Sequence, residues 1–254
     1  MPKWEAAVTT ENPKILYRIV KLLKEIDVKF VICSPVDHRC EHAHIVISGP
    51  DDNSLQHKHR IEINEDFDDD FVRIEITSNL HDIYNPSRTI VGIDPGMTFG
   101  IALVIDGIAV YSCSLTSPDE VVVLTQTLLK HAHTLFPASE QIIRVGTGSK
   151  LYTALILRSF RNSTIISSLE LVNEHRTTII SGARSDESAA ILIAGRTGRT
   201  MTDSDINIEP KAGYIRSLKQ YVSRQTRGKK SLTSDEARSL ISGERALEDV
   251  LNHS

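Results

Sequence analysis

The order of strand-like and helix-like segments between residues 89 and 200 is the feature that most constrains the fold. Three β-rich segments come first, at residues 89–94, 101–106 and 108–114, and the dipeptide Asp106-Gly107 between the last two is a hairpin signal. Helices and strands then alternate, at residues 117–135, 141–145, 149–160, 167–173 and 186–196. This order, β-β-β-α-β-α-β-α, predicts an antiparallel meander followed by crossovers, and therefore an α/β fold with a mixed sheet covered by helices.

The segments on either side predict two further parts. Residues 1–85 are typical of a small N-terminal α/β domain, with strands at 4–9, 29–33, 44–48 and 61–63 and a helix that begins at Pro13. The alternating residues 71–76 predict another half-exposed strand, which the acidic run 65–70 would join to the preceding one as a charged hairpin connection. The C-terminal part predicts a basic helical extension, so we expect domains at 1–85, 86–204 and 205–254.

Composition excludes several classes of protein. With 254 residues, 40% of them hydrophobic and 24% charged, the chain is typical of a soluble globular protein. Its apolar runs, such as residues 101–105, are far shorter than the roughly 20 residues that span a membrane, and the N-terminus lacks the apolar core of a signal peptide. Cys33, Cys40 and Cys113 are too few for a full disulfide framework, so we expect a cytoplasmic protein with no membrane partner.

The net charge of −4 conceals an uneven distribution. A negative total argues mildly against a nucleic-acid partner, but residues 51–75 carry −6, residues 89–200 are neutral and residues 211–230 carry +7. The basic stretch predicts a helix that binds phosphates, while Tyr214 and Tyr221 on its apolar face are expected in the core rather than as stacking platforms. The bases of this stretch expected to contact nucleic acid are Arg216, Lys219, Arg224, Arg227, Lys229 and Lys230.

Three acidic residues stand at the ends of predicted elements. Asp94 ends the first strand of the meander, Glu174 follows the strand 167–173, and Asp186 begins the next helix. Acids in such positions can converge on one edge of a sheet, and convergent carboxylates suit Mg²⁺ or Mn²⁺, which prefer oxygen ligands. The competing interpretation is that Asp94-Pro95-Gly96 is a simple turn and that Asp186 is a helix cap.

Three stretches of sequence resemble a known family. Residues 90–102, which include Gly92-Ile93-Asp94-Pro95-Gly96, resemble the opening strand and turn of RuvC-type Holliday-junction resolvases. The stretch from Val172 to Thr178 is similar to the Asp-Glu-Arg-x-Thr-Thr motif of the YqgF branch of that superfamily, and residues 186–194 resemble the acidic, small-residue helix that closes both groups. The resemblance extends over residues 89–199, and the element order is that of the RNase H-like fold.

The resemblance implies a metal-dependent nuclease that hydrolyses phosphodiester bonds of branched DNA or structured RNA. Asp94, Glu174 and Asp186 would be the catalytic residues and would hold Mg²⁺ or Mn²⁺. Arg176 would contact a phosphate and Thr177 would shape the site or contact the backbone. The small residues Ala189, Ala190 and Ala194 would let the last helix approach the sheet closely, and a homodimer would match the two-fold symmetry of a junction.

The sequence also departs from that family. The strand 141–145 runs into Gly146-Thr147-Gly148-Ser149-Lys150, which lacks the acid that RuvC enzymes carry there, and Ala189 occupies the position of a second helix acid. The glycine-rich turn favours a tight strand-to-helix connection with Ser149 as the helix cap. A phosphate-binding turn is the weaker interpretation, and in a nuclease Lys150 would lie near the phosphates.

Two alternatives to a nuclease stay open. The missing acid is compatible with a catalytically degenerate RNase H-like module that only binds nucleic acid. The stretch from Asp94 to Thr98 also resembles the first phosphate loop of sugar-kinase and actin-like nucleotide-binding proteins, but the sequence shows no second domain with its own Asp-x-Gly loop.

A group of histidines and cysteines precedes the strand 44–48. His38, Cys40, His42 and His44 alternate, so they would share a face on an extended segment. Their residue types suit zinc, but the spacing is not that of a standard zinc module, and a solvated histidine-rich loop is the favoured interpretation.

Overall fold

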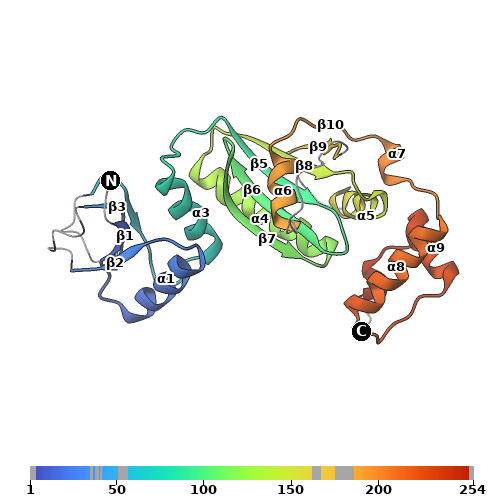
Figure 1. Ribbon diagram of the computed structural model, residues 1–254, viewed down its shortest axis with the longest axis horizontal. Helices are drawn as coiled ribbons and strands as arrows, with labels where there is room; N and C mark the ends of the chain where they lie inside the picture. The colour runs from blue at the N-terminus through green and yellow to red at the C-terminus, as the bar shows by residue number, and fades with distance from the viewer. Residues whose placement is uncertain are drawn as a thin grey trace, which may run out of the picture. The chain divides into compact units, whose positions relative to one another are not determined.

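The computed structural model describes residues 4–34, 37, 40, 42–50, 57–161, 167–174 and 186–251. It divides into two compact units, one formed by Met1–Ser87 with Lys130–Ser139 and the other by Arg88–Leu129 with Glu140–Ser254. Figure 1 shows the elements of both units. Among the helices of the described ranges, none is both long enough and apolar enough to cross a membrane.

The first unit contains a four-stranded parallel sheet in the order β2-β1-β3-β4. Aliphatic side chains of the sheet and of two helices form a single cluster, so both helices pack on one face of the sheet. The strands are β1 (Trp4–Val8), β2 (Phe30–Ile32), β3 (Ala43–Ser48) and β4 (Arg60–Glu62), and the helices are α1 (Pro13–Glu25) and α3 (Asp69–Leu80).

Helix α1 begins at Pro13, as the sequence predicts. The side-chain oxygen of Asn12 accepts hydrogen bonds from the backbone N–H groups of Lys14 and Ile15, which have no partner inside the helix. Proline suits the first helical position because its backbone has no N–H group to satisfy. The apolar positions then follow at helical spacing, and Ile15, Ile19, Leu22 and Leu23 are buried.

Helix α3 corrects the sequence-based prediction of a strand at residues 71–76. The acidic run does not connect two strands but leads into this helix, where Asp68 is the N-cap and accepts a hydrogen bond from the Phe71 N–H. Asp69 and Asp70 lie in the first turn, where the helix dipole favours negative charge.

The alternating pattern arises because α3 is buried on two opposite sides. Val72 and Ile76 belong to the cluster on the sheet, whereas Ile74 and Ser78 are buried on the other side of the helix. Phe71 packs against the sheet cluster and its ring also contacts the ring of His131, within the C-terminal part of α4 that belongs to this unit. Two buried stripes on opposite sides of a helix give a period close to two, which in sequence is indistinguishable from a strand.

The second unit contains a six-stranded mixed sheet in the order β10-β9-β8-β5-β6-β7. Strands β5, β8 and β9 are mutually parallel, β6 is antiparallel to both of its neighbours, and β10 is antiparallel to β9. The short strand β10 is not predicted by the sequence. The strands are β5 (Arg88–Asp94), β6 (Phe99–Ile105), β7 (Ile108–Leu115), β8 (Glu140–Gly146), β9 (Ser168–Val172) and β10 (Arg199–Thr200).

The meander and the crossovers follow the predicted order. Asp106 and Gly107 both have positive φ, at 44° and 90°, as the two-residue turn of a β-hairpin requires. The three helices that follow are α4 (Pro118–Leu135), α5 (Lys150–Arg161) and α6 (Asp186–Ala194), and Figure 1 shows α6 lying across the middle of the sheet. The prediction of an α/β fold with a mixed sheet is therefore confirmed.

Helix α6 approaches the sheet closely because the residues at the contact are small on both the helix and the sheet. A Cβ atom added to Gly92 would lie 2.2 Å from the Ala190 carbonyl oxygen, and one added to Gly100 would lie 2.0 Å from the Asp186 carbonyl oxygen. Ala190 and Ala194 are fully buried on the helix side. The small helix residues expected from the sequence are thus matched by two glycines of the sheet, which position the start of α6 directly over the β5–β6 pair.

Four helices follow β10 in the described residues. A capping box begins α9, because Thr233 and Glu236 exchange side-chain and backbone hydrogen bonds there. Tyr221 of α8 is fully buried and donates its hydroxyl to the Thr116 carbonyl oxygen at 2.5 Å. The helices are α7 (Asp203–Ile206), which the sequence does not predict, α8 (Ala212–Gln225), α9 (Ser234–Ser242) and α10 (Glu248–Leu251).

The predicted histidine-rich face is not formed by the residues that can be placed. Cys40 is fully buried and forms a disulfide with Cys33, so neither thiolate is available as a zinc ligand. His44 lies in β3, where its ring stacks on that of His59, and His38 lies outside the described residues. Cys113 takes part in no disulfide bond.

Candidate active site

Asp94 is the last residue of β5, the strand on which the second sheet is centred. Side chains alternate along a strand, so Asp94 points to the same face as Ile90, which is the face that α6 covers. In the β5–β6 ladder its partner is Gly100, and on the other side the neighbouring pair joins Ile93 to Val145 of β8. Asp94 therefore lies where β5, β8 and the start of β6 meet.

Glu174 reaches the same edge from β9. It follows that strand by two residues, and its carboxylate oxygen Oε1 accepts a hydrogen bond from the Gly148 N–H at 2.7 Å. The carboxylate lies over the end of β8, since a Cβ atom added to Gly146 would be 2.3 Å from Glu174 Oε1. The glycine at the end of β8 thus provides the space that the glutamate occupies.

Asp186 completes the group as the first residue of α6. Its backbone lies against Gly100, the ladder partner of Asp94. The next residue, Glu187, is turned away from this edge and accepts a hydrogen bond from the Ser112 hydroxyl of β7 at 2.8 Å. Asp94, Glu174 and Asp186 are therefore at one edge of the sheet, and the adjacent acid is engaged elsewhere.

The pKa of Asp94 reflects its position near the other two acids. Burial, and after it the negative charges of Glu174 and Asp186, together raise the pKa of Asp94 from 3.8 to about 6. A carboxyl group with a pKa this close to neutrality is typical of functional sites, because burial and like charges are seldom combined elsewhere.

The donor chemistry of this edge fits a hard divalent cation. Three carboxylates supply oxygen ligands, and a bound cation would reverse the repulsion that raises the pKa of Asp94. In the part of the chain that the structure describes, however, no three His, Cys, Asp or Glu side chains are arranged closely enough to hold a metal ion as they stand. Ligand types and location fit a metal, whereas the side-chain positions would have to close around it.

Lys150 begins α5 beside this edge and lines a cavity of about 510 Å³ together with Thr147 and Asn173. The turn before it behaves as a strand-to-helix connection, since the Ser149 carbonyl accepts the Thr153 N–H at 2.9 Å, as the residue at a helix N-cap does. One of the glycine amides proposed for phosphate is already occupied by Glu174.

The basic residues at the C-terminus separate into two groups. Lys219 reaches the Ser234 hydroxyl, and Lys230 donates to the Val250 carbonyl oxygen, so both contribute to the packing of the C-terminal helices. The exposed bases of the stretch are Lys211, Arg216, Arg224, Arg227 and Lys229. Arg176 and Thr177 lie outside the described residues.

Two features near the site are missed by the sequence analysis. Arg144 of β8 is buried, forms an ion pair with Glu170 of β9 at 2.8 Å and donates to the Ala194 carbonyl oxygen at 2.6 Å. It thereby satisfies the last turn of α6 and fixes that helix over the sheet. Its position in an otherwise apolar strand is the only sequence signal of this role.

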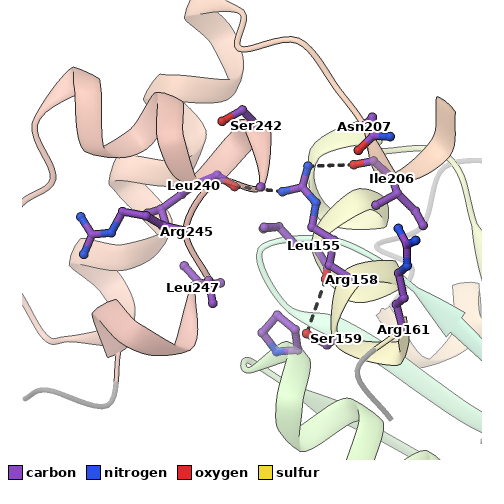
Figure 2. A pocket seen from close by; sticks show the side chains of 13 residues that line it. Leu155, Arg158, Ser159, Arg161, Ile206, Asn207, Leu240, Ser242, Arg245 and Leu247 are labelled. Carbon is purple, nitrogen blue, oxygen red and sulfur yellow. Dashed lines mark hydrogen bonds between the residues drawn. The ribbon is translucent and has the colours of Figure 1, made fainter. Parts of the chain in front are cut away.

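A second cavity, of about 240 Å³, lies between α5, α7 and the segment after α9 (Figure 2). Its central side chain is Arg158, which donates to the carbonyl oxygens of Ile206, Leu240 and Ile241 at 2.6–2.9 Å. Figure 2 shows that the guanidinium groups of Arg161 and Arg245 lie on opposite sides of Arg158. This cavity is therefore a structural junction between helices rather than a site with converging charges.

No protein-family model matches the chain, and no curated protein matches it. Among solved structures, the chain is similar to the Argonaute of Marinitoga piezophila, solved in complex with a 5′ OH guide RNA and target DNA. The similarity has a TM-score of 0.26 and 14% sequence identity, and it covers 66% of this chain and 39% of that chain. The chain thus spans well under half of that protein's length, and a similarity of this size does not establish a shared fold.

Proposed function

We propose that the protein is a metal-dependent nuclease that hydrolyses phosphodiester bonds of structured nucleic acid, such as branched DNA or structured RNA. The observation that carries the proposal is the convergence of Asp94, Glu174 and Asp186 at one sheet edge, with the pKa of Asp94 raised to about 6. The strand order supports it, because a meander of which the first strand is central and is followed by two parallel crossover strands is the arrangement of the RNase H-like fold that the sequence resembles.

The residues of the site have separate tasks in this proposal. Asp94, Glu174 and Asp186 would hold Mg²⁺ or Mn²⁺, which stabilises the negative charge that develops on the attacking and leaving oxygens. The Gly148 N–H orients the Glu174 carboxylate, and Gly100 lets the start of α6 bring Asp186 to the edge. Lys150 contributes positive charge beside the carboxylates, where the phosphate backbone would pass.

The remaining contacts to nucleic acid would come from three places. Arg176 and Thr177 belong to the motif that follows Glu174, and we assign them to the scissile strand on the resemblance alone. The exposed bases of the α8 region would contact phosphates without reading sequence. We further propose a homodimer acting on two-fold symmetric substrates, a cytoplasmic location and functional domains at residues 1–85, 86–204 and 205–254.

The test is cleavage of a labelled four-way junction, a flap and a structured RNA in Mg²⁺ or Mn²⁺. We expect the wild type to cleave at least one of them, D94N to cleave none, and the matched control E187Q, which changes the adjacent acid bonded to Ser112, to retain activity. Thermal unfolding gives a second readout, since either metal should stabilise the wild type and leave D94N unchanged. Equal cleavage by wild type and D94N would overturn the proposal.

A degenerate module that binds nucleic acid without cleaving it is the second candidate. The observation that favours it is the engagement of Glu174 with the Gly148 N–H, together with the lack of a closed metal-binding group among the described side chains. Tight binding to junctions with no cleavage in either metal, and no stabilisation of the wild type by metal, would select this alternative.

A further inference from the structure

The cavity of about 510 Å³ beside the carboxylate edge has two walls. One wall is the β8–α5 connection with the end of β9, and contributes Thr147, Lys150 and Asn173. The other is the segment from β10 to the first turn of α8, and contributes Asp205, Lys211, Tyr214 and their neighbours. Asn173 directly precedes Glu174, so the cavity opens next to the group of acids described above.

The size of the cavity suits a single small organic group. Binding sites for small molecules occupy about 300–1,000 Å³, and this cavity falls in the lower half of that range. A nucleic-acid duplex is too wide to enter it, whereas one nucleotide that has left its stack can.

The charged residues on the walls of the cavity have a net positive charge, which suits a phosphate. Arg199 and Asp205 form a two-pronged ion pair at 2.6 and 2.8 Å, and Asp205 also accepts from the Thr202 N–H. These bonds hold the pKa of Asp205 far below its usual range, so this pair stays internally neutral. Among the other charged residues of the described lining, Lys150 and Lys211 then face a single acid, Glu209.

Tyr214 supplies an aromatic surface in this cavity. The sequence predicts Tyr214 in the core with Tyr221, but of the two only Tyr221 is fully buried, where it packs against Tyr152. Tyr214 lies one helical turn before Leu218 on the same side of α8, beyond the packed part of the helix, and is only partly buried. Its ring therefore lines the cavity instead of filling the core.

We propose that this cavity receives one unpaired nucleotide of the nucleic acid, with the base against Tyr214 and its phosphate toward Lys150 and Lys211. Aromatic side chains stack on any base, so such a pocket selects strand structure rather than sequence. The proposal rests on the proposed function for the identity of its ligand. It makes flaps and loops the favoured substrates, because these present unpaired nucleotides that can enter the cavity next to the carboxylate edge.

The experiment measures binding without cleavage, in EDTA, so that its outcome is independent of catalysis. Oligonucleotides with 2-aminopurine at one position are presented as a single strand, as a flap and as a full duplex of the same sequence. When the protein binds, we expect the 2-aminopurine fluorescence of the single strand and of the flap to be quenched, which indicates stacking. The fluorescence of the duplex should not change. Y214A should abolish the quenching and weaken binding about 5- to 100-fold, and Y214F should retain both.

Two controls make the result specific. Y17A removes an exposed tyrosine of the first unit and should leave quenching and affinity unchanged. Deoxyadenosine monophosphate is added as a competitor, and we expect displacement only at a large excess, since the free nucleotide lacks the contacts of the rest of the strand. Displacement at concentrations similar to the oligonucleotide's would overturn the proposal in favour of a free-nucleotide site.

Failure of this proposal is distinguishable from failure of the nuclease. If Y214A binds the single strand as the wild type does, or if the duplex is quenched equally, the nucleotide pocket is wrong even where cleavage is observed. Quenching that depends on Tyr214, in a protein that cleaves nothing, supports the pocket and rejects the nuclease.

Discussion

Asp94 is placed where its negative charge is unfavourable. It is partly buried at the end of a central strand, and its neighbours Glu174 and Asp186 carry the same charge. An ordinary structural role would pair such a carboxylate with a base, as Arg144 is paired with Glu170 in the same sheet. The contrast within one sheet shows that the repulsion at Asp94 is a local property of this edge.

This repulsion predicts a pH-dependent cost to stability in the absence of metal. The folded-state pKa of about 6 exceeds the unfolded value of 3.8, so folding favours the protonated form. The stabilisation is complete below pH 4 and is lost as pH rises through 6. We expect about 1 to 2 kcal/mol of such loss, because one pKa unit corresponds to about 1.4 kcal/mol and solvent screens a partly exposed group.

The measurement is the free energy of unfolding by denaturant at pH 4.5 and pH 7.5, in EDTA, for wild type and D94N. The variant carries no charge at this position, so its gain in stability relative to the wild type should be larger at pH 7.5 than at pH 4.5. D66N, which neutralises an exposed acid of the first unit, should show no such pH-dependent gain. If the free energy of unfolding changes with pH in the same way for wild type and D94N, repulsion at Asp94 does not destabilise the folded protein.

At the scale of elements, the sequence predicts most of the second unit and misreads part of the first. The strands and helices of residues 88–194 follow from local patterns, since hairpin, cap and alternation signals all agree there. Helix α3 is misread because two buried sides imitate a strand, and local sequence does not show that a second surface covers Ile74. The closeness of Glu174 to Gly148 likewise depends on strand order, which only the folded sheet reveals.

Small elements are hard to predict for a related reason. Helix α7 has four residues and β10 has two, so neither has room for a periodic pattern. Their positions are determined by side chains from distant parts of the sequence. Arg158 of α5, for example, donates to the carbonyl oxygen that ends α7 and to two carbonyls in the last turn of α9.

We therefore predict that Arg158 stabilises the C-terminal helices. R158M would keep most of the apolar stem but remove the charged donors, leaving the carbonyls of Ile206, Leu240 and Ile241 without them. We expect a loss of about 2–4 kcal/mol in the free energy of unfolding, because hydrogen bonds from a charged group are worth more than neutral ones. Amide hydrogen exchange should increase most in α9.

R161M is the matched control, because it changes an exposed arginine one turn further along the same helix. It should alter stability by no more than about 0.5 kcal/mol. Equal effects of R158M and R161M, or exchange that rises uniformly over the second unit, would contradict the role assigned to Arg158.

Over the whole molecule, the positions of the charged residues say more about nucleic-acid binding than the net charge does. The net charge of −4 includes a neutral stretch at residues 89–200 that contains the three carboxylates, and a stretch of +7 at residues 211–230. The structure divides that basic stretch further, since Lys219 and Lys230 contribute to packing, whereas Arg216, Arg224 and Arg227 are exposed. Only exposed bases can exchange bound counterions for phosphates, so the effective basic surface is smaller than the sequence count.

This distinction predicts how nucleic-acid binding depends on salt. Each phosphate contact contributes about 0.7–0.9 to the slope of log affinity against log salt concentration. The triple variant R216Q/R224Q/R227Q should therefore lower the slope for a flap substrate by about 2. K230Q should leave the slope unchanged and instead lower stability, because that lysine donates to a backbone carbonyl of α10.

The comparison uses equilibrium binding in EDTA at four or more salt concentrations, with K14Q/K21Q/K24Q, which also removes three positive charges, as the control on α1 of the first unit. If the α8 surface carries the backbone of the substrate, the control keeps the wild-type slope although it also removes positive charge. If both sets of substitutions lower the slope equally, binding responds to net charge alone, and the assignment of the substrate path to α8 is wrong. A local effect is the expected result because charges more than about 8–10 Å apart are screened at physiological salt.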